Sequence, residues 1–237
     1  MASWRTTRTN RYVARHRPDV DHADLFNTIQ KPPRYRVGQH PNVHVHDFGK
    51  GVVSVRDFTP KDTAYRRPED VFPIMERIAG GRPALVEELL AHFQIFHSDG
   101  PRHLLVTAWH AGSRPMREFL ADAAISGVQK RRALEVLMRK LARLHANGYL
   151  HGHPKVDNAV ASAKQVGLLV DPTRLYEPYP GMFDIERENE CVQLASGLAT
   201  HLSRAVTGTK KMELERQLRS IYEKAFNRFI RHLNRRT

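Results

Sequence analysis

The fold is decided by residues 141–171, which read LARLHANGYLHGHPKVDNAVASAKQVGLLVD. Their first part continues an apolar helical stripe, and we expect that helix to end at Asn147 and Gly148, because Asn and Gly are typical of helix C-termini. A polar loop of eight residues, 151–158, follows. A strand pair should then return the chain to a single carboxylate, Asp171. The pattern predicts a helix, a polar loop and a hairpin that bring Asn158 and Asp171 together.

Composition limits the class of protein. The chain has 237 residues, of which 41% are hydrophobic and 27% charged, so we expect a folded chain of one domain or two lobes. No apolar run approaches the roughly 18 residues that a membrane-spanning helix needs. The first residues lack the apolar stretch of a signal peptide. Cys191 is the one cysteine, which excludes an internal disulfide, and we therefore expect a cytoplasmic protein.

The chain is strongly basic, with a formal net charge of +13, and the excess gathers at both ends. Such a field attracts polyanions, so nucleic acid or a phosphorylated lipid surface is a candidate partner. Solubility with non-specific attraction is the plainer interpretation of the same charge. One functional hypothesis is therefore a basic nucleic-acid-binding or scaffold protein without catalysis.

The region before the loop is predicted to be rich in strands. We expect a basic N-terminal arm over residues 1–33 and a β-rich region over residues 34–111, with a hairpin turn at Gly49 and Gly51. The predicted elements are, in chain order, strands at 43–48 and 52–58, helices at 68–80 and 83–91, and strands at 93–96 and 103–109.

Residues 112–237 are predicted to be mainly helical, with the hairpin of the central segment set among the helices. The expected helices cover residues 116–124, 129–147, 186–205 and 210–234. Strands dominate the first part of the chain and helices the second, so the sequence predicts an α+β protein with two lobes.

Two motifs resemble one known family. Residues 144–152, LHANGYLHG, resemble the L-H-x-x-G-x-x-H-G run of protein-kinase-like phosphotransferases, closest to the lipopolysaccharide (Kdo/heptose) kinases and the Bud32-like atypical kinases. Residues 53–58, VSVRDF, resemble the V-x-V-K-D-F strand that holds the nucleotide lysine. The resemblance covers about residues 43–205. It implies a two-lobed protein-kinase-like fold with a small β-rich N-lobe, a mainly helical C-lobe and a catalytic-loop-like segment at 149–171.

The resemblance also implies ligands, namely ATP and Mg²⁺ in an interlobe cleft. Asn158 and Asp171, which are thirteen positions apart, would hold the Mg²⁺. The position of the family's catalytic Asp is occupied by His153, which can accept a proton but does not orient a hydroxyl as a carboxylate does. Asp157 in the same loop is the other candidate. Two hypotheses follow: a divergent ATP-dependent phosphotransferase, or a pseudokinase that binds the nucleotide only.

The β-rich region would supply the phosphate contacts. Arg56 stands at the lysine position and would meet the nucleotide phosphates, with Glu76 orienting it; Glu87 or Glu88 could take that role instead. The family's glycine-rich loop is reduced here to Gly49 and Gly51 around Lys50, a small cradle for phosphate.

Overall fold

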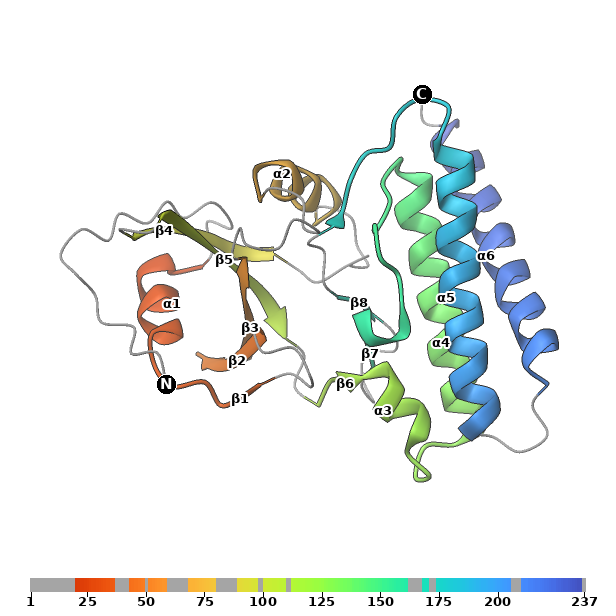
Figure 1. The fold of residues 1–237 in the computed structure, drawn as a ribbon, viewed down its shortest axis with the longest axis horizontal. Coiled ribbons are helices and arrows are strands. Elements are labelled where there is room, and N and C mark those ends of the chain that lie inside the picture. The colour runs from red at the N-terminus through yellow and green to blue at the C-terminus, as the bar shows by residue number, and fades with distance from the viewer. Residues whose placement is uncertain are drawn as a thin grey trace. The chain divides into compact units, whose positions relative to one another are not determined.

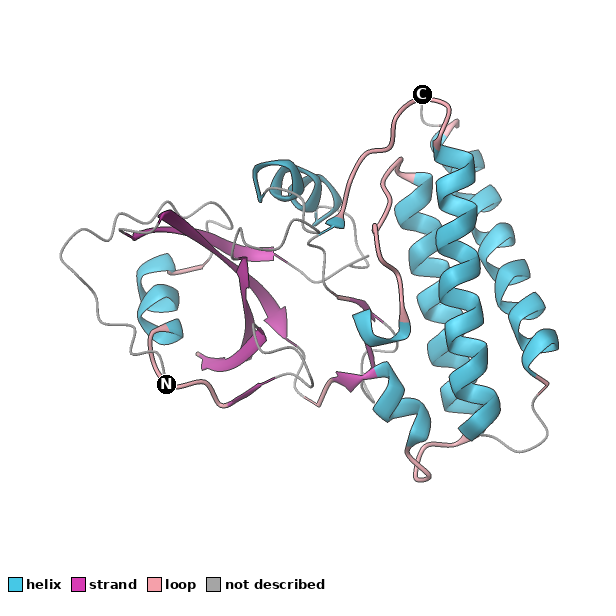
Figure 2. Cartoon of the chain, viewed as in Figure 1, coloured by secondary structure: helices cyan, strands magenta, loops and turns pink. Residues whose placement is uncertain are grey.

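The computed structural model shows an α+β protein, as the sequence predicts (Figure 1). The described residues are 20–36, 43–49, 51–58, 68–79, 89–97, 100–109, 112–161, 168–170, 174–205 and 210–235. The chain forms two compact units, one of Met1–Phe72 with Glu87–Ala111 and the other of Pro73–Val86 with Gly112–Thr237. Figure 2 shows that strands dominate the first unit and helices the second.

The first unit contains a five-stranded antiparallel sheet with the strand order β1-β2-β3-β5-β4. Its strands are β1 (Tyr35–Arg36), β2 (Val43–Phe48), β3 (Gly51–Phe58), β4 (Leu89–His97) and β5 (Gly100–Trp109). The helix predicted over residues 83–91 is wrong at 89–91, because Leu89 and Ala91 pair with Thr107 and Val106 of β5. Pairing along a whole neighbouring strand overrides the local helical pattern there. Residues 83–88 lie outside the described part.

One face of this sheet is apolar and is covered by helix α1 (His22–Ile29). Asp21 caps the start of α1, and its side chain accepts from two backbone N–H groups of the first turn. Leu25 and Phe26 point into the core, where the Phe26 and Phe93 ring centroids are 5.2 Å apart. The other members of this core are Val53, Val55, Ala91, Ile95, Leu104 and Val106. Residues 22–29, within the predicted N-terminal arm, are therefore part of the packed body.

The opposite face of the sheet holds buried polar side chains. Side chains alternate between faces along a strand, so Ser54 and Arg56 of β3 point away from the apolar core. The Ser54 and Thr107 hydroxyl oxygens are 2.6 Å apart, and Arg56 lies opposite Leu105 of β5. Helix α2 (Pro68–Ala79) begins on this unit, and its Phe72 ring lies 3.8 Å from the ring of His92.

The second unit is built on three long helices that pack together: α4 (Gly127–Ala146), α5 (Phe183–Ala205) and α6 (Lys211–Leu233) (Figure 1). The predicted apolar stripe of α4 is confirmed, since five of its side chains are fully buried: Leu134, Leu137, Met138, Leu141 and Leu144. A short helix, α3 (Met116–Ala121), precedes α4.

A small sheet lies beside these helices. It has the order β6-β7-β8, with β6 (Arg114–Pro115), β7 (Ala159–Ala161) and β8 (Leu168–Leu169). The 3-10 turn η1 (Val156–Asn158) leads directly into β7, and β7 pairs with β8 as an antiparallel hairpin. The hairpin predicted after the polar loop is confirmed for these residues.

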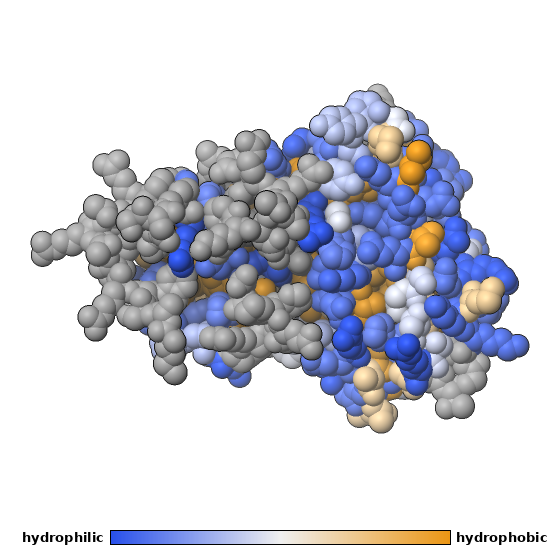
Figure 3. Space-filling view, in the orientation of Figure 1, coloured by the Kyte–Doolittle hydropathy of each residue, from blue (hydrophilic) through white to orange (hydrophobic). Residues whose placement is uncertain are grey.

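Most of the described surface on the face shown in Figure 3 is hydrophilic, with scattered apolar side chains. None of the described helices is both long and apolar enough to cross a membrane.

Candidate functional site

The site begins where α4 ends. The helix starts with a capping box between Ser126 and Gln129, and its C-cap is Asn147, followed by Gly148 at φ +83°. This is the end that the sequence predicts. The chain then turns back, and Leu150 forms an isolated antiparallel bridge with Tyr176, through backbone hydrogen bonds of 2.9 and 3.1 Å. The polar loop therefore leaves α4 in a defined direction.

A buried carboxylate on α5 holds the start of the loop. Glu190 is 6% exposed, and its Oε2 accepts from the backbone N–H of His151 at 3.0 Å. The backbone N–H of Gly152 donates to Oε1 of the same carboxylate. Hydrogen bonds to a charged acceptor are stronger than neutral ones. Two successive amide groups of the loop are thus fixed to one side chain of the central helix.

The same carboxylate is joined to a buried relay of hydrogen bonds. His145 of α4 donates from Nε2 to Glu190 Oε2 at 2.9 Å, and the Tyr222 hydroxyl donates to His145 Nδ1 at 2.5 Å. Burial lowers the pKa of His145 despite the opposing effect of Glu190, so its ring is neutral at pH 7. Burial also raises the pKa of Tyr222, so the phenol keeps its proton. Helices α4, α5 and α6 are therefore linked at the base of the loop.

Gly152 permits a close backbone contact. Its φ is +79°, and a Cβ at this position would lie 2.3 Å from the carbonyl oxygen of Arg174. Real Cβ atoms do not approach a backbone oxygen so closely, and positive φ is itself unfavourable for other residues. Only glycine allows the loop to pass the segment before α5 at this distance.

Asn158 closes the loop and is almost completely buried, at 1% exposure. Its side-chain Nδ2 donates to the backbone carbonyl of His153 at 3.0 Å. Its backbone carbonyl accepts from the backbone N–H of Val170 at 2.9 Å. Its Oδ1 is buried and has no hydrogen-bond partner among the residues that the structure describes. The structure therefore brings the predicted residues His153 and Asn158 together and leaves the Asn158 amide oxygen without a partner among the described residues.

The other predicted residues of this loop are placed differently. Asp157 forms an ion pair with Arg117 of α3 at 3.0 Å, so its carboxylate is directed to that helix. Asp171 follows Val170 in the chain and lies outside the described residues. Within the described part of the chain, no group of three His, Cys, Asp or Glu side chains is placed to hold a metal ion. A cation here would depend on Asn158, Asp171 and oxygens of its ligand.

The predicted phosphate contacts of the first unit lie on β3 and the turn before it. Gly49, at φ +56°, and Gly51 form the end of the β2–β3 hairpin, as the sequence predicts. Arg56 is 9% exposed on the polar face of the sheet, whereas Glu76 is exposed on α2. Glu87 and Glu88 lie outside the described residues. The roles given to these residues stay predictions.

Sequence reasoning missed Glu190 and its relay. An indication was present, because Glu190 is in line with Leu194 and Leu198 at four-residue spacing, on the buried face of α5. A carboxylate on an apolar helical face requires buried donors. No family model matches this chain, and no curated protein matches it. Assignment of the site rests on its residues and their geometry.

Proposed function

We propose that this chain binds a Mg-nucleotide at the loop that ends at Asn158, as an atypical protein-kinase-like protein. The observation that supports the proposal most directly is the buried Asn158 Oδ1, which has no hydrogen-bond partner among the described residues. A buried polar atom left without a partner costs about 1–3 kcal/mol. Coordination of a cation by this oxygen would offset that cost.

The chemistry of the position suits Mg²⁺. This ion prefers hard oxygen ligands and takes only one or two from the protein, because phosphates and waters complete the octahedron. The hydrogen bond from Nδ2 to the His153 carbonyl fixes which end of the Asn158 amide is the oxygen end. In protein kinases, a catalytic-loop Asn and a second Asp hold the metal ions. Here Asp171 would be the second ligand.

The first unit offers a cation for the phosphates. In protein kinases the phosphate-binding lysine is on the third strand of the sheet. In this chain Arg56 is on β3, on the face that also holds Ser54 and Thr107. A guanidinium binds phosphate oxygens through two parallel N–H bonds, so an arginine can replace the lysine as a binding group. The role of Arg56 as a phosphate-binding group rests on its strand position and on the resemblance of residues 53–58.

Transfer of the phosphoryl group is the less supported half of the hypothesis. The loop has one carboxylate, Asp157, and its ion pair with Arg117 directs it to α3. The position after Gly152 is His153, whose backbone oxygen accepts from Asn158 Nδ2. A neutral imidazole can accept a proton but gives a weaker negative field than a carboxylate. We therefore favour the pseudokinase form, which binds nucleotide without efficient transfer.

Thermal unfolding with and without ATP and Mg²⁺ tests binding. We expect the ligand to raise the melting temperature, since binding only to the folded state stabilises it. Asn158→Ala and Asp171→Ala should each abolish that rise. Asp184→Ala is the matched control, because this carboxylate at the start of α5 is 82% exposed, and its variant should keep the rise. A wild-type chain without a ligand-dependent rise would overturn the proposal.

Turnover separates the two forms of the hypothesis. A pseudokinase should show no ATP hydrolysis or autophosphorylation above that of Asp171→Ala. In that case His153→Asp restores the missing carboxylate and should raise turnover without loss of binding. Wild-type activity that disappears in both Asp171→Ala and His153→Ala would instead identify a divergent phosphotransferase in which the histidine acts as the base.

A further inference from the structure

A second feature of the chain lies away from the loop, in a groove between α4 and α6. The groove has a volume of about 900 Å³. Its half-buried apolar residues are Ile221 and Phe229. Its basic lining residues are Arg139 from α4, four residues from the last turns of α6 and one residue after it: Lys224, Arg228, Arg231, His232 and Arg235. We call this the basic groove.

The cations of the basic groove form one row. Lys224, Arg228 and Arg231 follow one another on α6 at intervals of four and three residues, so they share a helix face, and Arg235 comes just after the end of the helix at Leu233. At about 1.5 Å per residue, the helical part of the row, from Lys224 to Arg231, is roughly 10 Å long. All four side chains belong to exposed residues. A linear array of positive charge is thus presented along the wall of a concave surface.

Few carboxylates neutralise this row. Residues 224–235, KAFNRFIRHLNR, contain no Asp or Glu. Among the described residues that line the groove, Arg139 forms an ion pair with Glu135 at 3.1 Å. Arg231 donates to the backbone carbonyl of Asn227 and not to a carboxylate. The positive field of the basic groove therefore remains available to an external anion.

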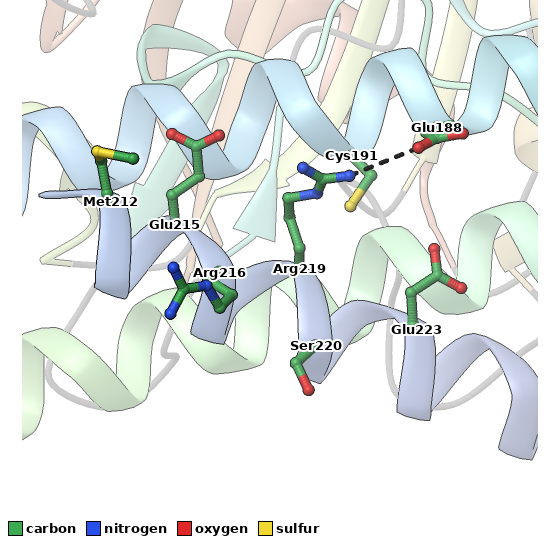
Figure 4. Close-up of a pocket in the computed structure, with 8 residues that line it drawn as sticks. All are labelled: Glu188, Cys191, Met212, Glu215, Arg216, Arg219, Ser220 and Glu223. Atoms are coloured by element: carbon green, nitrogen blue, oxygen red, sulfur yellow. Dashed lines mark hydrogen bonds and ion pairs between the residues drawn. The ribbon is translucent and has the colours of Figure 1, made fainter.

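The other side of the same helix gives the contrast. A groove of about 510 Å³ between α5 and α6 is also lined by arginines, Arg216 and Arg219 (Figure 4). Arg216 pairs with Glu213 at 2.8 Å. Arg219 lies 3.5 Å from Glu188, the contact drawn as a dashed line in Figure 4. Glu215 and Glu223 line this groove as well. Positive charge is balanced on that side of α6 and unbalanced in the basic groove.

We propose that the basic groove binds a single strand of nucleic acid through its phosphates. A strand has repeated charges along a line, which matches a linear row of cations, and arginine binds phosphate oxygens in pairs. The Phe229 ring packs against Arg143, whose guanidinium carbon is 5.9 Å from the ring centroid, so recognition rests on the phosphates. A membrane surface fits less well, because an interfacial helix buries an exposed apolar face in lipid, and here Ile221 and Phe229 are half-buried among the cations.

Fluorescence anisotropy of a labelled oligouridine with the full chain tests this inference. We expect binding that weakens steeply with salt. Arg228→Gln with Arg231→Gln removes two charges from the row and should weaken binding at low salt by about tenfold, and reduce the salt slope by about 1.4, since each phosphate contact contributes about 0.7 on single strands. The matched control, Arg216→Gln with Arg219→Gln, removes the same charge from the same helix and should bind within about twofold of wild type.

Three results would overturn the inference. Equal weakening by the two double variants would mean attraction by net charge alone. Binding to vesicles of anionic phospholipid, without binding to the oligonucleotide, would identify a lipid surface. Equal affinity for polyglutamate would identify an acidic peptide. Asn158→Ala should leave oligonucleotide binding unchanged, so the failure of the nucleotide proposal and the failure of this one are distinguishable.

Discussion

Glu190→Gln is the perturbation that tests most sharply how the loop is held. The carboxylate accepts from the backbone N–H groups of His151 and Gly152 and from His145 Nε2. A Gln amide keeps one acceptor oxygen and replaces the other with an NH₂ group, which would face the donor from His151 or Gly152. At least one buried backbone N–H then loses its partner.

The expected cost follows from these contacts. One unsatisfied buried donor costs about 1–3 kcal/mol, and a hydrogen bond to a charged acceptor contributes about 1.5–3 kcal/mol, so the variant should lose roughly 3 kcal/mol of unfolding free energy. For a chain of this size, about 1 kcal/mol corresponds to about 2–4 °C, so the melting temperature should fall by roughly 6–12 °C. The measurement is thermal unfolding followed by circular dichroism, with urea unfolding as a second probe.

The control is Glu188→Gln, two residues away on α5. Its side chain is 64% exposed and its partner Arg219 is 3.5 Å away, so the loss should be under about 1 kcal/mol. If the unfolding free energy of Glu190→Gln is within about 1 kcal/mol of the wild-type value, then the carboxylate does not hold the loop. The variant should also lose the ATP-dependent rise in melting temperature, because the loop would no longer position the Asn158 amide.

Two further predictions concern the backbone and pH. Gly152→Ala should abolish the ATP-dependent rise in melting temperature, because its Cβ would lie 2.3 Å from a carbonyl oxygen. Gly148 is also at positive φ but has open space around it, so Gly148→Ala should keep the rise and lower the unfolding free energy by about 1 kcal/mol. Burial lowers the pKa of His145, His46 and His201 in the folded state. Below about pH 6.5 the unfolded chain then binds more protons than the folded chain. The unfolding free energy from urea titrations should therefore fall as the pH is lowered from about 7 to 5. A rise over this range would contradict the buried neutral state of His145.

The sequence was sufficient for features set by local pattern. The end of α4 at Asn147 and Gly148, the hairpin at Gly49 and the apolar stripe of α4 all depend on residues close together in the chain. It was insufficient where distant residues meet. The role of Glu190 depends on donors about forty positions away, and β4 starts at Leu89 because β5 pairs with it. The protein-kinase-like fold and the Mg²⁺ ligand Asp171 stay predictions.

The contacts that shape the loop explain how its form and its chemistry can be inherited separately. The backbone atoms of Leu150, Gly152 and residue 153 bond to Tyr176, Glu190 and the Asn158 amide. His151 is held both by its backbone N–H, to Glu190, and by its ring Nε2, 3.1 Å from the Val170 carbonyl oxygen. Every residue type has the carbonyl that Asn158 Nδ2 uses, so this bond does not distinguish His153 from an aspartate. The hydrogen bond that fixes the Asn158 amide therefore does not depend on the side chain at position 153. This separation is the physical reason why we infer nucleotide binding more firmly than phosphoryl transfer.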